Sequence, residues 1–96
     1  MGADVFYHKA SGSTVEIAFQ NAIKEACYDY GHSGYTGTIA EKDSYVIIDC
    51  PKDTDPQYYA DTLISNQDDR IDDKWGPAGA IKLSEDTWLF FGWASS

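Results

Sequence analysis

Two glycine-rich segments, Gly31–Thr38 and Lys74–Ala80, constrain the fold of this chain more than any other feature of its sequence. Glycine adopts backbone conformations that other residues avoid, and it lets neighbouring segments approach closely. Each segment is flanked by aromatic residues and by stretches in which apolar residues recur regularly. The backbone geometry at these two places is therefore expected to be prescribed.

The first glycine segment follows a predicted helix. Ser13 is expected to cap the start of this helix, because Ser13-Thr14-Val15-Glu16 matches a capping box. Apolar residues then recur at three- and four-residue spacing, which predicts a single apolar stripe. They are Val15, Ala18, Phe19, Ala22, Ile23, Ala26, Cys27 and Tyr30. Gly31 follows as the expected left-handed stop.

Stretches rich in β-branched and aromatic residues predict the strands. They are residues 4–9, 38–41, 44–49, 80–83 and 87–91. The second and third are expected to form an antiparallel hairpin around Lys42-Asp43, and the last two a hairpin around 84–86. The final strand has apolar residues on both faces, which indicates a central position in the sheet. Asp55 before Pro56 predicts the start of a second helix.

The element order β-α-β-β-α-β-β predicts an α+β fold. The 96 residues suffice for one domain, covering 1–96, and are too few for two. We expect a two-layer sandwich with two helices on one face of a mainly antiparallel sheet.

The composition is strongly acidic, with 16 Asp and Glu against 7 Lys and Arg and a net charge of -9. Direct nucleic-acid binding is not expected, because that affinity comes largely from Lys and Arg. No run of eighteen apolar residues and no secretion leader are present, which predicts a cytoplasmic protein without membrane association. Cys27 and Cys50 form no CxxC pattern, so we expect reduced thiols and neither metal nor cofactor.

Aspartates gather in the second half of the chain. They are Asp49, Asp53, Asp55, Asp61, Asp68, Asp69, Asp72 and Asp73. Their spacing does not match a calcium-binding loop. A solvated face is one explanation, and a surface that steers a basic protein partner is the sharper one. The candidate partner-binding residues are Asp68, Asp69, Asp72, Asp73 and the adjacent Trp75, because Trp is enriched at interface hot spots.

The aromatic content is high for a small domain, at 15% of all residues. A fold of this size struggles to bury every ring, so an exposed aromatic patch is expected. Its candidate members are Tyr28, Tyr35, Tyr58 and Trp75.

The segment Gly31–Thr38 offers a second candidate site. Gly31-His32-Ser33-Gly34 lacks the spacing of a nucleophile elbow, and it follows a helix C-terminus, where a phosphate is not favoured. His32, Ser33 and Tyr35 remain as polar groups that would serve a small-ligand pocket.

Three segments resemble a group of small uncharacterised proteins encoded by bacteriophages and by actinobacteria. They are Gly34–Lys42, Lys74–Ile81 and Trp88–Trp93. The resemblance covers most of the chain. It implies an accessory protein of the bacterial cytoplasm, made in an infected cell or from a prophage-like region, and it carries over no catalytic residue.

The leading hypothesis is a small acidic module that binds a macromolecule without catalysis, most plausibly a basic protein of the host or phage. It would modulate a host or defence factor, and one version is mimicry of nucleic acid by carboxylates. The alternative is a small-ligand-binding or minor enzymatic domain with a pocket at Gly31–Thr38. A virion structural component is the third hypothesis. The sequence leaves open whether the protein is an enzyme and favours a non-catalytic role.

Overall fold

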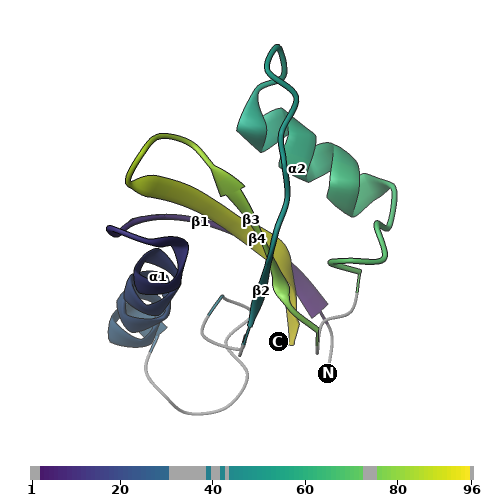
Figure 1. Ribbon diagram of the computed structural model, residues 1–96. Coiled ribbons are helices and arrows are strands. Elements are labelled where there is room, and N and C mark those ends of the chain that lie inside the picture. Colours follow the sequence, from purple (N-terminus) through teal and green to yellow (C-terminus); the bar gives the residue numbers. More distant parts are fainter. Residues whose placement is uncertain (1–2, 31–38, 40–41, 43, 73–75, 96) are drawn as a thin grey trace.

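The computed structural model describes residues 3–30, 39, 42, 44–72 and 76–95. Within these residues the chain forms two helices and four strands (Figure 1). In chain order they are β1 (Ala3–Ser11), α1 (Val15–Tyr30), β2 (Tyr45–Ile47), α2 (Pro56–Ser65), β3 (Ala78–Lys82) and β4 (Thr87–Ser95). Neither helix in this part of the chain has the length and apolar composition that a membrane crossing requires.

The four strands form one mixed sheet in the order β1-β4-β3-β2. β4 is antiparallel to β1 along its whole length, from Ser95 opposite Ala3 to Thr87 opposite Ser11. It is also antiparallel to β3, whereas β2 and β3 are parallel. The predicted α+β class and mainly antiparallel sheet are therefore confirmed. The β3–β4 hairpin and the interior position of β4 also match the prediction.

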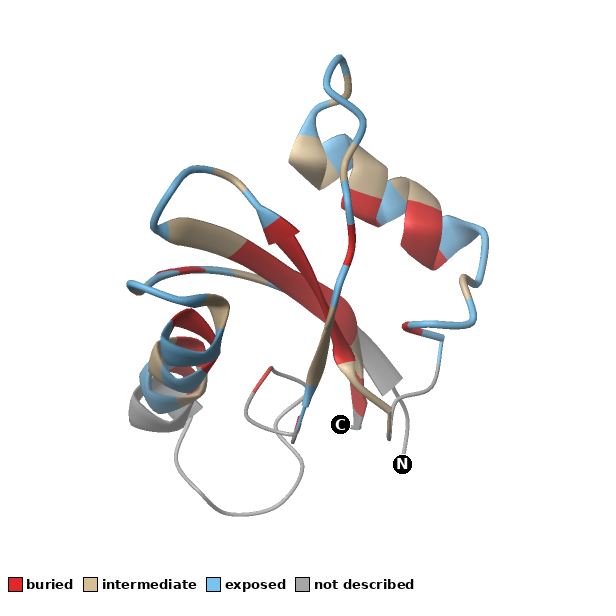
Figure 2. Ribbon diagram, in the orientation of Figure 1, coloured by how far each residue is buried: buried red, intermediate tan, exposed pale blue. Residues whose placement is uncertain are grey.

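The two helices pack against opposite faces of this sheet. Phe90 and Ala94 of β4 belong to a buried cluster with α1, which we call the α1-side cluster. Leu89 and Phe91 belong to a second cluster with α2, the α2-side cluster. Successive residues of a strand point to opposite faces, so the clusters lie on the two sides of the sheet. Figure 2 shows the buried stretches of β3 and β4 between the helices.

This placement differs in one detail from the expected arrangement, in which both helices share a face. The reason lies in β4, whose residues are buried on both sides, including Leu89, Phe90 and Phe91. A strand that is apolar on both faces needs cover on both. One helix on each side supplies that cover.

β2 pairs in parallel with β3, whereas the predicted antiparallel hairpin involves residues 38–41, most of which the structure does not describe. Ile39 lies in a 3₁₀ turn, and the other residues of 38–41 are outside the described part of the chain. Lys42-Asp43 is a poor pair for a tight hairpin turn. Within the run 45–48, Val46 and Ile48 instead join the α2-side cluster when β2 lies beside β3.

Helix α1 begins where Thr14 caps it. The Thr14 hydroxyl accepts a hydrogen bond from the Ile17 amide at 3.2 Å, so Thr14 takes the capping role that the sequence assigned to Ser13. The predicted stripe is confirmed, since Ala18, Phe19, Ala22 and Ala26 are buried and Val15 and Ile23 are partly buried against the same cluster. Gly31 and the side chains of residues 27–30, including Cys27 and Tyr28, lie outside the described part.

Three aromatic rings tie α1 to the sheet. Phe19 of α1 contacts Tyr45 of β2 and Phe90 of β4, with ring centroids 5.0 and 5.5 Å apart. Tyr45 and Phe90 complete the triangle at 6.4 Å. Tilted and edge-on ring pairs of this kind add to the stabilisation from burial. α1 is therefore anchored over β2 and β4 as well as β1.

Candidate functional site on helix α2

Helix α2 starts as the sequence predicts. Asp55 is the N-cap, its carboxylate accepts a hydrogen bond from the Tyr58 amide at 3.3 Å, and Pro56 occupies the first turn. Ala60, Leu63 and Ile64 are buried against the sheet. The capped first turn fixes which side of the helix faces outward.

The outward side of α2 carries acidic and aromatic groups. Asp55, Tyr58, Asp61 and Ser65 are exposed at three- and four-residue spacing, and we call these four residues the α2 surface. Tyr58 has 66% of its surface exposed, more than the other large hydrophobic residues that the structure describes as exposed. Tyr58, a candidate member of the expected aromatic patch, is thus exposed, while the side chains of Tyr28, Tyr35 and Trp75 lie outside the described part of the chain.

Asp61 connects the α2 surface to the edge strand β1. The Tyr7 hydroxyl donates a hydrogen bond to the Asp61 carboxylate. Burial raises the pKa of Tyr7 to about 12, and the hydrogen bond and the negative charge of Asp61 act in the same direction. Tyr7 therefore keeps its proton at neutral pH and remains a donor. This contact extends the α2 surface onto β1.

The stretch of chain that contains α2 is strongly acidic. Between residues 49 and 72 the chain carries seven aspartates, while Lys52 and Arg70 are the two basic residues. Clustered charge of one sign raises the association rate of a partner with the opposite sign. The structure thus presents an exposed tyrosine within an acidic region.

Asp68, one of the predicted partner-binding residues, is bonded within the chain. The backbone amide, Nε and Nη2 of Arg70 each donate to its carboxylate at 2.9 Å. The side-chain hydrogen bond from Arg70 is the main cause that lowers the pKa of Asp68 to about 2, and the same bond raises the pKa of Arg70. Much of the charge of Asp68 is therefore compensated locally.

The other predicted site residues divide into two groups. Asp69 and Asp72 are exposed, as a partner-binding role requires. The remaining predicted residues lie outside the described part of the chain, namely Asp73 and Trp75 of the acidic site and His32, Ser33 and Tyr35 of the pocket. Asp61 was counted among the clustered aspartates but not selected, because its contact with Tyr7 spans 54 residues and leaves no local pattern.

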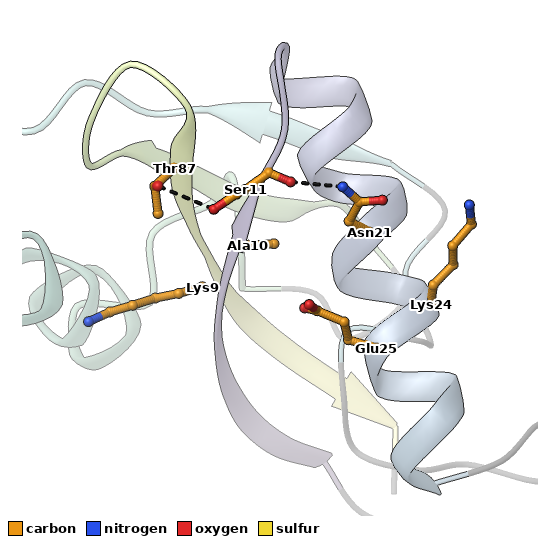
Figure 3. Close-up of a pocket in the computed structure, with 7 residues that line it drawn as sticks. All are labelled: Lys9, Ala10, Ser11, Asn21, Lys24, Glu25 and Thr87. Carbon is orange, nitrogen blue, oxygen red and sulfur yellow. Dashed lines mark hydrogen bonds between the residues drawn. The ribbon is translucent and has the colours of Figure 1, made fainter.

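A hollow of about 440 Å³ lies between β1 and α1 (Figure 3). Its polar groups are largely engaged with one another. Asn21 donates to the Ser11 carbonyl at 2.8 Å, and the Ser11 hydroxyl lies 3.3 Å from that of Thr87. The side chains of Lys9 and Lys24 point away from each other in Figure 3, so no pair of charges converges on a ligand.

Metal and thiol chemistry find no support in the described residues. No three His, Cys, Asp or Glu side chains among them are grouped to hold a metal ion. The Cys50 thiol donates weakly to the carbonyls of Pro51 and Thr54, and burial is the main cause that raises its pKa. A raised pKa reduces the thiolate fraction and hence reactivity.

Comparison of the chain with protein-family models, curated proteins and solved structures finds no match. The resemblance to small phage and actinobacterial proteins therefore stays a prediction.

Proposed function

We propose that this protein is a non-catalytic binding module that engages a basic protein through the α2 surface. The observation that carries the proposal is the exposed ring of Tyr58 on an acidic helix. Tyrosine is enriched among residues that dominate interface energies, because it offers a large apolar ring with a polar tip. A basic partner that covers Tyr58 would also meet Asp55 and Asp61.

The acidic residues around α2 and Tyr58 have different roles in this proposal. Exposed carboxylates such as Asp69 and Asp72 act at a distance and accelerate the encounter with a basic protein. Tyr58 becomes desolvated only in the complex, so it contributes mainly to the lifetime of the complex. We therefore assign the predicted acidic residues around Asp68 to the steering of the partner. The direct contact with the partner is assigned to the α2 surface.

The resemblance to phage and actinobacterial proteins supports a bacterial host protein as the partner, and thereby a role in modulating a host or defence factor. Nucleic-acid mimicry is a less supported version. Mimicry needs free carboxylates at regular spacing, and Asp61 and Asp68 are both hydrogen-bonded within the chain. The proposal therefore rests on a protein partner of ordinary basic character.

The test is capture of bacterial proteins by the immobilised full chain at low and high salt, followed by kinetics with the captured protein. Tyr58→Ala should mainly speed dissociation, by about 2 kcal/mol in affinity if Tyr58 is a hot spot. Asp69→Asn combined with Asp72→Asn should slow association and weaken its salt dependence.

Ile17→Ala is the matched control. Ile17 is a hydrophobic residue on α1 with 42% of its surface exposed, and α1 lies on the other face of the sheet. Its replacement should leave binding unchanged. A captured protein that binds the Tyr58→Ala variant as tightly as the parent would overturn the proposal.

A further inference from the structure

β2 is an edge strand of the sheet that the described residues form. β2 bonds to β3 on one side, where the Ser44 carbonyl accepts from the Ala78 amide at 3.0 Å and the Ile48 amide donates to Ala80 at 2.9 Å. In a parallel ladder alternate residues bond to the same neighbour. Ser44, Val46 and Ile48 therefore face β3. The amides and carbonyls of Tyr45 and Ile47 point to the other side.

No residue in the described part of the chain provides a hydrogen bond to these outward groups of Tyr45 and Ile47. Short length is one protection of this edge, since β2 has three residues. Two other common protections, a proline and a charged side chain, are absent from its sequence Tyr-Val-Ile. Ile47 is 53% exposed, which is unusual for a β-branched apolar residue at a sheet edge.

A hollow of about 530 Å³ lies between α1 and the start of β2. Phe19, Ile23 and Tyr45 supply its apolar part. Glu16, Gln20 and Ser44 supply polar groups. Lys42 also lines it, with its amino group donating to the Gly76 carbonyl at 3.0 Å. The hollow therefore has the mixed lining that an apolar side chain on a peptide backbone would fit.

A second hollow of about 350 Å³ lies at the other end of the same strand. Its lining includes Ile47, Asp49, Lys82 and Trp88. Tyr45 and Ile47 are two residues apart, so their side chains point to the same face of the sheet. The outer edge of β2 thus has a hollow near each end. In an extended strand laid along this edge, side chains two residues apart would point to the face of the sheet that carries the hollows.

We propose that the outer edge of β2 accepts an extended peptide segment of a partner protein as an added strand beside the four that the structure describes. The outward groups of Tyr45 and Ile47 would supply the backbone hydrogen bonds. An apolar side chain would enter the hollow beside α1, and basic residues would flank it. Backbone pairing gives affinity and alternate side-chain pockets give specificity in this mode of recognition.

A basic peptide fits this edge better than a second copy of the chain does. Two copies would each bring a net charge of -9 to the contact. β2 is also only three residues long, which is little for the area that a stable dimer buries. A short segment needs only these few bonds and one or two seated side chains. Each hollow pairs one acid with one lysine in its lining, Glu16 with Lys42 and Asp49 with Lys82. The preference for basic flanking residues therefore comes from the net charge of -9 on the whole chain.

The test is selection of binders from a random peptide library displayed on phage, with the full chain as target. The expected result is a set of peptides with apolar residues at alternate positions and nearby Lys or Arg. Their binding should protect the Tyr45 and Ile47 amides from hydrogen exchange. No enriched peptide, or enriched peptides that leave both amides unprotected, would overturn the proposal.

Ile47→Pro is the decisive variant, because proline removes the outward amide while the bonds to β3 come from neighbouring residues. The selected peptides should lose affinity at least about fivefold. Ile47→Val, which keeps the amide and the β-branched shape, should bind as the parent does. Equal affinity for Ile47→Pro, once circular dichroism shows it folded, would contradict the proposal. If it does not fold, the hydrogen-exchange result decides.

Tyr58→Ala separates this inference from the function proposed for α2. The variant should bind the selected peptides normally, because Tyr58 lies in α2, against the other face of the sheet. Peptides that lose affinity for Tyr58→Ala and keep it for Ile47→Pro would place peptide binding at the α2 surface and overturn the β2 proposal. The α2 proposal is tested separately, by the binding of the captured bacterial protein to the Tyr58→Ala variant.

Discussion

The two faces of the sheet are covered in different ways. α1 has 16 residues and meets the sheet with fully buried alanines and a triangle of aromatic rings. α2 has 10 residues, and a cap at Asp55 and a hydrogen bond from Tyr7 support its three buried side chains. The α1 side is therefore expected to dominate stability, and the α2 side to carry recognition at the cost of weaker packing.

The largest expected effect tests this difference directly. Phe90 is completely buried in the α1-side cluster, so Phe90→Ala should lower the free energy of unfolding by about 3–5 kcal/mol. Leu63 on α2 retains 7% exposure, and Leu63→Ala should cost about 2 kcal/mol, because its site can relax toward solvent. Urea unfolding measures both. An equal or larger loss at Leu63 would show that α2 is the stronger half of the core.

The features that the sequence predicted well are local ones. The stripe from Ala18 to Ala26 follows from helical spacing alone, and Asp55-Pro56 marks the start of α2 because capping needs only neighbouring residues. The interior position of β4 follows from its apolar residues on both faces. These inferences depend on periodicity and capping, which one sequence displays directly.

The features that it missed depend on which distant segments meet. The parallel pairing of β2 with β3 brings Tyr45 beside Ala78, and the link between Tyr7 and Asp61 spans most of the domain. Neither contact leaves a pattern in adjacent residues. The exposed tyrosine at 58 and the aspartates around it could be anticipated from the sequence, but the contact of Asp61 with Tyr7 depended on the fold.

A second prediction concerns the tight packing of side chains over Gly79 of β3, on the α2 side of the sheet. A Cβ added at Gly79 would lie 2.6 Å from the Phe91 ring and 3.1 Å from the Ile48 side chain. Overpacking of this kind costs about 1–3 kcal/mol. Gly79→Ala should therefore lower the melting temperature. Unchanged stability would show that the α2-side cluster is loose enough to absorb a methyl group.

A third prediction isolates α2 from the rest of the fold. Asp55→Ala removes the acceptor for the Tyr58 amide and should cost about 1 kcal/mol. Asp55→Asn is the control, because asparagine caps about as well. Hydrogen exchange should speed up in the α2 amides and stay unchanged in α1. Equal acceleration in both helices would mean that the two sides of the sheet open as one unit.

The smallest expected effect lies in the contact between α2 and β1, and it depends on pH. The folded state holds the Tyr7 proton more tightly than the unfolded chain does, because its pKa is raised to about 12 from 10.0. The stabilisation from this contact is therefore complete below pH 10 and is lost as the pH rises from 10 toward 12.

Asp61→Asn removes the negative charge, so the Tyr7 pKa should fall. It should stay above 10, because burial is the largest cause of the shift. Carbon-13 resonances of labelled tyrosine follow the titration, with Tyr7→Phe to assign the signal. An unchanged Tyr7 pKa in Asp61→Asn would show that Asp61 does not hold α2 to β1, and the α2 surface would then end at the helix.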